Sequence, residues 1–206
     1  MPLDDFSTFN SNLLTEWFSD LVSLWHETGP IEPNHFSSPK ELFQWIHYQN
    51  YILWHLEDDA RREDLPPEEI VSVKRSIDNH NQARNDGIER LDHYLDEKLR
   101  ENGINAEAAD MNSETPGSIV DRLSILSLKI FHMDEQIERK HVSKQHRAQA
   151  RARKEILMEQ QSDLGKAFDK LIQDLKEGKK RHKLYRQFKM YNDPNLNPSL
   201  YNQKQN

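Results

Sequence analysis

The sequence predicts an all-α fold, a single-domain bundle of about five helices, several of them long, with an extended tail rich in proline and asparagine. Apolar residues recur every three or four positions over long stretches of the 206-residue chain, which is the spacing of one helix face. Only six glycines occur and β-branched residues are sparse, which argues against a sheet-rich fold. The mix of 31% charged and 35% hydrophobic residues is typical of long amphipathic helices, and we take residues 1–206 as one domain.

The first two helices are predicted from their ends as well as from their apolar faces. The first is expected over about residues 10–28, because Gly29 and the proline after it stop the apolar pattern. The second is expected to begin just after Ser38, which has the spacing of a capping box with Glu41. It is expected to continue to about Asp64, where the proline pair of "LPPEEI" breaks the chain.

Three further apolar patterns complete the predicted bundle. A third helix is expected over about residues 67–102, ended by Gly103. Thr115 and the proline after it are expected to cap a fourth helix, which is apolar nearly all round. A basic and weakly periodic segment, residues 139–154, separates this helix from a heptad-like seam that runs to Gly178.

The last segment, residues 190–206, carries the sequence "MYNDPNLNPSLYNQKQN". Its prolines pre-set the backbone and lower the entropy lost on ordering. We therefore expect the tail to dock on the bundle as an extended segment that buries at least Tyr191 or Leu196.

Composition excludes several classes of protein. The absence of cysteine rules out disulfides and thiolate zinc sites. No signal peptide and no apolar run long enough for a membrane span are recognised, so we expect a cytoplasmic protein. The net charge is −7, with an acidic first part, residues 1–121, and a basic second part, residues 122–206. Acidic residues interrupt the basic part, so no nucleic-acid partner is expected.

Aromatic and ionisable residues share one side of the predicted second helix. Opposite an ordinary core stripe, this side carries Phe43, His47, Asn50, Tyr51, Trp54, Glu57, Asp58 and Arg61. A solvent-facing side seldom carries so many aromatic rings, and a core-facing side seldom carries so many charges. Mixed faces of this kind line ligand pockets, and the alternative is a helix buried on both sides with its charges paired.

Polar residues also interrupt the third and fourth helices. Asn81 and Arg84 lie between Ile77 and Ile88 in a seam that is otherwise apolar. The fourth helix places Asp121, Arg122, Lys129 and His132 among apolar neighbours. An unpaired buried charge is costly, so we expect the polar groups to converge. The region expected to be shared contains Trp54, Arg61, Arg84, Asp121 and Arg122.

Two arrangements of this polar region remain open. The first is a closed ion-pair network that fixes how the helices pack. The second is an anion pocket in which the positive charge of Arg84 is uncompensated in the apo protein. Leucine at positions 81 and 84 would then stabilise that protein by up to about 1–4 kcal/mol. We favour the pocket, because the seam is apolar on both sides and Arg122 and Lys129 add further cations.

The predicted site residues fall into two roles. Candidates for a general acid or base are Glu57, Asp58 and His132. Candidates for ligand binding, through guanidinium forks, amides and a stacking ring, are His47, Trp54, Arg61, Asn81, Arg84, Asn85, Asp121, Arg122 and Lys129.

No metal or other cofactor is predicted, although one stretch is dense in metal-ligand residue types. That stretch contains His47, His55, Glu57, Asp58 and Asp59. Magnesium needs only one or two carboxylates beside substrate phosphates, so it is the metal to consider. The paired ExxH motifs of di-iron bundles are absent, and so are the paired acidic motifs of helical nucleotide pyrophosphohydrolases. No GxSxG elbow or glycine-rich phosphate loop occurs either.

Four segments together carry a resemblance to a known family: "LWHLEDDAR", "IDNHNQARNDGIERLD", "SETPGSIVDRLSILSLKIFHM" and "YRQFKMYNDPNLNPSLY". In this order, and over nearly the whole chain, they resemble the bacterial domain-of-unknown-function family 4254. The family pattern corresponds here to Trp54, Glu57, Asp58, Arg61, Asp78, Asn81, Arg84, Asp92, Glu114, Asp121, Arg122, Ser124, Lys129 and His132. The family often has an aliphatic residue where this chain has Asp59, which argues against a role for that carboxylate.

The resemblance also implies a biological setting. Family members often lie near genes for glycosyltransferases of surface polysaccharide, which implies a role in glycan assembly. The expected ligand is then an anionic small molecule such as a phosphorylated or nucleotide-activated sugar, with or without catalysis. One alternative is a helical adaptor that docks on a glycosyltransferase through residues 139–154 and the tail. Another is a magnesium-dependent helical phosphohydrolase.

Overall fold

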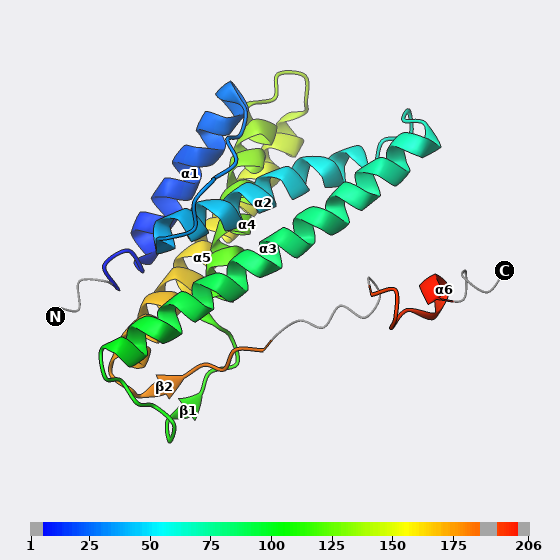
Figure 1. The fold of residues 1–206 in the computed structure, drawn as a ribbon. Helices are drawn as coiled ribbons and strands as arrows, with labels where there is room; N and C mark the ends of the chain where they lie inside the picture. Colours follow the sequence, from blue (N-terminus) through cyan, green and yellow to red (C-terminus); the bar gives the residue numbers. More distant parts are fainter. Residues whose placement is uncertain (1–5, 186–192, 202–206) are drawn as a thin grey trace.

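Five long helices pack as a bundle in the computed structural model, and Figure 1 shows them in chain order from blue to yellow. The structure describes residues 6–185 and 193–201, without the side chains of the last two. The predicted all-α bundle is confirmed. Its elements are α1 Ser11–Thr28, α2 Pro39–Asp59, α3 Pro67–Glu101, β1 Asp110–Met111, α4 Pro116–Glu138, α5 Lys144–Lys176, β2 Lys180–Arg181 and α6 Pro198–Tyr201.

The predicted capping signals set the starts of α2 and α4. The Ser38 side chain accepts a hydrogen bond from the Glu41 N–H, and the Glu41 side chain bonds back to the Ser38 N–H. Thr115 and Ser118 form the same reciprocal pair at α4. Each helix therefore begins with its first N–H groups satisfied and with proline at its first position.

The end of α2 differs from the prediction. The helix stops at Asp59 instead of Asp64, and the N–H groups of Arg61 and Arg62 bond to carbonyls three residues back. This tighter turn ends the helix before the prolines are reached. Residues 61–64, just beyond Ala60, are all charged and offer no apolar face that would hold a further helical turn against the bundle.

The apolar faces of the long helices meet in one core. Its largest cluster includes Leu14, Phe18, Leu42, Phe43, Ile46, Leu91, Leu95, Leu123, Phe168, Leu171 and Leu175. A second cluster, rich in aromatic rings, contains Leu21, Val22, Trp25, Tyr51 and Leu128. The polar groups described below border this second cluster. No helix in the described ranges is both long and apolar enough to cross a bilayer.

The first turn of α1 is held from two directions. The Asn10 side chain accepts a hydrogen bond from the Leu13 N–H at 3.1 Å. Asp169, on α5, accepts bonds from the Ser11 N–H at 2.8 Å and from the Ser11 hydroxyl at 2.6 Å. The start of α1 is therefore fixed partly by its own cap and partly by a distant helix.

α2 and α3 run antiparallel and approach closely at Gly87. A Cβ atom at this position would lie 2.6 Å from Cδ1 of Trp45. The Trp45 indole is itself anchored, because its Nε1 donates a hydrogen bond to the Ala83 carbonyl at 2.9 Å. The two backbones can approach this closely only because residue 87 has no side chain.

We expect Gly87→Ala to lower the free energy of unfolding by about 1–2 kcal/mol, as is typical of overpacking. Alanine gains up to about 1 kcal/mol over glycine from helix propensity, but the clash with an anchored indole outweighs this gain. Urea denaturation of the variant measures the difference. Asp86→Ala, one residue away and exposed, is the control and should change stability by less than about 0.5 kcal/mol. A Gly87→Ala protein as stable as the wild type would contradict the close approach.

Two features lie outside the helices of the bundle. The first is a two-residue parallel ladder between β1, which follows α3, and β2, which follows α5. It pairs Asp110 with Lys180 and Met111 with Arg181, and the sequence did not predict it. In the tail, α6 lies apart from the long helices in Figure 1 and Leu196 is 49% exposed. Tyr191, the other residue expected to be buried, lies outside the described residues. Docking of the tail therefore stays a prediction, without Leu196 as its anchor.

Candidate functional site

A polar network connects α2, α3 and α4 inside the bundle. At its inner end, His47 Nδ1 lies 2.8 Å from the Ser124 hydroxyl. Asn50 Nδ2 donates to that hydroxyl at 3.0 Å and to the Asp121 carboxylate at 2.8 Å. At the outer end, Arg84 Nη1 donates to Asn50 Oδ1 at 3.2 Å. The network thus runs from a fully buried imidazole to a partly exposed guanidinium.

Burial sets the protonation of this network. It lowers the pKa of His47 to about 3, so the imidazole is neutral at physiological pH. Burial also raises the pKa of Asp121, while the nearby Arg84 charge and the Asn50 hydrogen bond lower it. Arg84 and Asn50 therefore favour the ionised form of Asp121, which burial disfavours.

The expectation that Arg84 is uncompensated in the apo protein is wrong. Its Nε lies 3.8 Å from the Asp121 carboxylate, with 24% and 15% of the two side chains exposed. This ion pair explains how the charged Arg84 is accommodated in the otherwise apolar seam of α3. Leucine at position 84 would therefore strand a carboxylate and not relieve a strain. Asn81 stands outside the pair and lines a neighbouring hollow on the surface.

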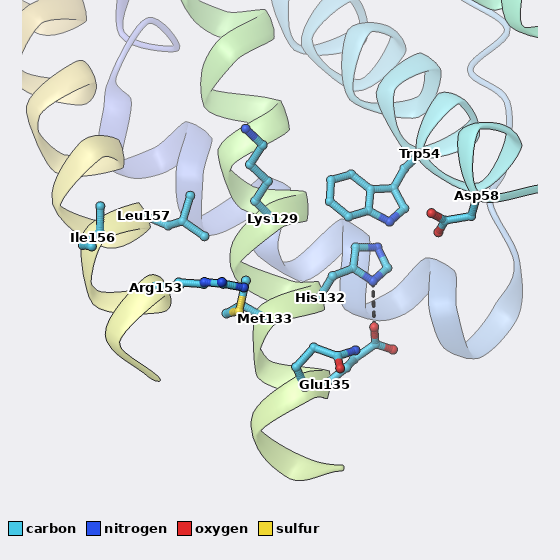
Figure 2. Close-up of a pocket in the computed structure, with 10 residues that line it drawn as sticks. Trp54, Asp58, Lys129, His132, Met133, Glu135, Arg153, Ile156 and Leu157 are labelled. Carbon is cyan, nitrogen blue, oxygen red and sulfur yellow. Dashed lines mark hydrogen bonds and ion pairs between the residues drawn. The ribbon is translucent and has the colours of Figure 1, made fainter. Parts of the chain in front are cut away.

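A cleft of about 670 Å³ opens between α2, α4 and α5. Figure 2 shows Trp54 and Asp58 on α2, Lys129 and His132 on α4, and Arg153 on α5 around it. Glu135 and Gln136 also line the cleft, and its apolar side chains are Met133, Ile156 and Leu157. Within the described residues, no carboxylate pairs with Lys129 or Arg153. The cleft therefore offers two cations without a carboxylate partner, two carboxylates, an aromatic ring and apolar walls.

One wall of the cleft is a stack of two rings. The His132 imidazole lies parallel to the Trp54 indole, with centroids 4.5 Å apart and planes at 4°. Glu135 accepts a hydrogen bond from His132 Nδ1 at 2.7 Å, drawn as a dashed line in Figure 2. The stack and this bond together fix the orientation of His132.

A second hollow, of about 350 Å³, shares Trp54 and Asp58 with the cleft. It brings together several predicted residues: Glu57 from α2, Arg61 from the turn after it, and Asn81 and Arg84 from α3. Arg61 pairs with Glu57 at 2.9 Å, and both side chains are well exposed. Such an exposed pair contributes little to stability.

The expected single polar region is only partly assembled. Arg122 is half exposed and pairs with Glu114, and in the described residues no hydrogen bond joins it to the network. Asn85 lines a third hollow, of about 530 Å³, together with Arg84 and Asp121. The structure therefore distributes the predicted ligand-binding residues over adjoining hollows and a buried network.

Three histidines from three helices lie together at one end of the aromatic cluster. One ring nitrogen each of His26, His55 and His132 lies within 4.8 Å of the other two. Among the described residues this is the one group with metal-ligand spacing. The stretch around His47 and Asp59, dense in metal-ligand types, does not form such a group. Burial lowers the pKa of His55, and the nearby His26 and His132 lower it further.

Sequence reasoning missed one wall of the cleft and one histidine. Arg153 lies in the basic segment 139–154, whose weak periodicity resembles a solvated surface. His26 follows the buried Trp25 at the end of α1, and nothing in its neighbourhood separates it from an ordinary core histidine. Pairing α1 with α4 would have found it, but the sequence carries no local signal for that pairing.

Comparison with known proteins gives one match. The family model described as "Protein of unknown function (DUF4254)" matches residues 40–184, which include most of α2 and all of α3, α4 and α5. No curated protein and no solved structure shows a significant match to the chain.

Proposed function

The chain belongs to the DUF4254 family of proteins of unknown function, and from its site we propose that it binds an anionic small molecule in the cleft between α2, α4 and α5. The ligand class is a phosphorylated or nucleotide-activated sugar. Catalysis is not part of this core proposal.

One observation carries the proposal. Lys129 and Arg153 reach the same cleft without a carboxylate partner in the described part of the chain. Two such cations attract a phosphate or diphosphate, and arginine can bind it through two parallel hydrogen bonds. The volume of about 670 Å³ lies in the range of small-molecule pockets.

The remaining lining residues favour a ligand with a planar or sugar part. Trp54 and the apolar side chains of Met133 and Leu157 would contact it, while Asp58 could accept hydrogen bonds from sugar hydroxyls. The resemblance of this chain to proteins encoded near glycosyltransferase genes supports surface-glycan metabolism as the setting. We further propose that the protein acts in the cytoplasm.

We expect sugar phosphates or nucleotide diphosphate sugars to raise the melting temperature of the full chain. Lys129→Ala combined with Arg153→Ala should weaken the affinity, measured by titration calorimetry, at least about tenfold, since two charge-assisted contacts are lost. The matched control combines Arg122→Ala with Arg151→Ala. It removes the same charge from the same two helices outside the cleft and should change the affinity less than about twofold. Equal loss in both double variants, or no response to any compound of this class, would contradict the proposal.

Catalysis in the cleft would need a general acid or base and is tested separately. Asp58, which lines both hollows, is the proposed general base, with Glu57 and His132 as the other acid–base candidates. Incubating the nucleotide sugars with Mg²⁺ and assaying phosphate or sugar-phosphate release tests the alternative of a magnesium-dependent phosphohydrolase.

A second candidate function is an adaptor for a glycosyltransferase. Ile156 and Met158 are 55% and 51% exposed on α5, beside the basic segment 139–154. An exposed apolar pair next to positive charge is typical of a docking surface. Co-purification with the glycosyltransferase, lost in Ile156→Glu and kept in Lys129→Ala, would favour this candidate over small-molecule binding.

A further inference from the structure

The three clustered histidines come from the ends of different helices. His26 lies in the last turns of α1, His55 near the end of α2 and His132 in α4. One ring nitrogen of each lies within 4.8 Å of the other two. Three imidazoles rarely come this close without a shared partner, because each brings a polar edge that must be satisfied.

Hydrogen bonds define which nitrogen is available on two of the rings. His26 Nδ1 lies 2.7 Å from the Val22 carbonyl, which can only accept, so Nδ1 carries the proton. His132 Nδ1 bonds in the same way to the Glu135 carboxylate at 2.7 Å. A neutral imidazole with its proton on Nδ1 has a free lone pair on Nε2.

Those lone pairs have no partner in the structure. The Nε2 atoms of His26, His55 and His132 are all buried from solvent and make no hydrogen bond. A buried polar nitrogen without a partner costs about 1–3 kcal/mol, and three in one place call for a common explanation.

The surroundings of the cluster are those of a metal site. Each imidazole packs against an aromatic ring: His26 on Phe131 at 4.3 Å, His55 on Tyr51 at 4.6 Å and His132 on Trp54 at 4.5 Å between centroids. A carbonyl and a carboxylate hold the far nitrogens of two of the rings. This is how proteins orient histidine ligands toward a metal ion.

We propose that His26, His55 and His132 bind one Zn²⁺ ion through their Nε2 atoms. Three neutral imidazoles suit zinc and similar divalent transition metals, whereas magnesium and calcium prefer oxygen ligands. Three protein ligands leave a fourth position open, as in catalytic zinc sites. The ion would retain its double positive charge beside His132, which also lines the anion cleft.

Binding requires a small contraction of the cluster. Tetrahedral zinc with ordinary Zn–N bonds places ligand nitrogens roughly 3.3 Å apart. Side-chain rotation at the ends of α1 and α2 can supply this change, because His26 and His55 lie near helix ends. The inference does not depend on the proposed function: the cluster shares only His132 with the cleft, and metal binding has its own test.

Metal-free full-length protein is titrated with Zn²⁺ by calorimetry and with Co²⁺ by visible absorption. We expect one Zn²⁺ per chain, tetrahedral Co²⁺ bands and no response to Mg²⁺. His26→Gln, His55→Gln and His132→Gln should each weaken zinc binding about 100-fold or more, because each removes a ligand. His80→Gln is the control: His80 is also partly buried and bonded through Nδ1, to Gln49, but lies outside the cluster.

A second pair of variants leaves the three buried histidines in place. Glu135→Gln weakens the support of His132 and should lower zinc affinity about 10–100-fold. Glu138→Gln, also exposed on α4, should leave the affinity unchanged. Wild-type protein without Co²⁺ bands, or cluster variants that bind Zn²⁺ as tightly as His80→Gln, would overturn the proposal. If the histidine variants do not fold, the wild-type Co²⁺ spectrum and the Glu135 and Glu138 pair decide.

Discussion

Replacing Arg84 with leucine is expected to lower the free energy of unfolding by about 2–3 kcal/mol at pH 7. Breaking a fully buried ion pair typically costs about 3–5 kcal/mol, because the partner is left charged and unpaired. Arg84 and Asp121 are partly exposed and 3.8 Å apart, which reduces the expected loss. Asn50 also loses the hydrogen bond that it accepts from Arg84. Urea denaturation monitored by circular dichroism measures the effect.

Two further variants isolate the charge pair. Adding Asp121→Asn to Arg84→Leu should recover part of the loss, because the stranded group can no longer ionise. Arg122→Leu, at the residue after Asp121, is the control. Arg122 pairs on the surface with Glu114, and its loss should change stability by less than about 1 kcal/mol. An Arg84→Leu protein more stable than the wild type would restore the anion-pocket interpretation of the seam.

The stability loss in Arg84→Leu should also depend on pH, in a direction that the pKa of Asp121 predicts. Burial raises the pKa of Asp121, and Arg84 lowers it, so the leucine variant raises it further. A carboxyl with a raised pKa binds its proton more tightly in the folded state, so stability falls as pH rises through that range. The loss in Arg84→Leu should therefore be smaller near pH 5 than at pH 7.

Asp92→Asn is expected to remove a large pH dependence of stability. Burial raises the pKa of Asp92 from 3.8 to about 6, although hydrogen bonds from Thr115 and the Gly117 N–H lower it. The Gly117 N–H donates to Asp92 Oδ1 at 2.6 Å, at the start of α4. Between the two pKa values the folded protein holds a proton that the unfolded chain has lost. The Asp92 contribution to stability therefore falls by about 2 kcal/mol as pH rises from 4 to 7.

Asparagine keeps an acceptor for the Gly117 N–H but cannot ionise. The difference in stability between Asp92→Asn and the wild type should therefore shift toward the variant by about 2 kcal/mol between pH 4 and pH 7. Histidines such as His47, whose pKa is lowered by burial, act in the opposite direction, but they are common to both proteins and cancel. Urea denaturation across this range supplies the comparison. A constant difference would show that Asp92 titrates normally.

The fold could be predicted because its signals are local. Ser38 with Glu41 and Thr115 with its proline specify helix starts within a few residues, and these starts were confirmed. The end of α2 was placed too late because a charged stretch carries no stop signal before the prolines. The β1–β2 ladder was missed for a different reason: Asp110 and Lys180 are far apart in sequence, and two residues are too few to show a pattern.

The site was harder, because its chemistry lies in pairings between helices. Spacing suggested that Asp121 and Arg84 would meet, and the structure places them together. The same reasoning included Arg122, but one step along the helix rotates the side chain by about 100° relative to Asp121, and Arg122 pairs with Glu114 on the surface instead. Asn50 connects the network, and His26 lies close to His132, because of how α1, α2 and α4 pack. The residue pattern of one helix carries no information about that packing.

The bond between Ser11 and Asp169 has a consequence for synthesis of the chain on the ribosome. α1 is made first, yet the carboxylate that completes its first turn follows 158 residues later. Until α5 is made, only Asn10 caps α1, while α2 and α3 can already pair as neighbours in sequence. α1 leaves the ribosome first but is among the last helices to be fixed in place. In a nascent chain that ends before Asp169, the first turn of α1 lacks one of its two partners.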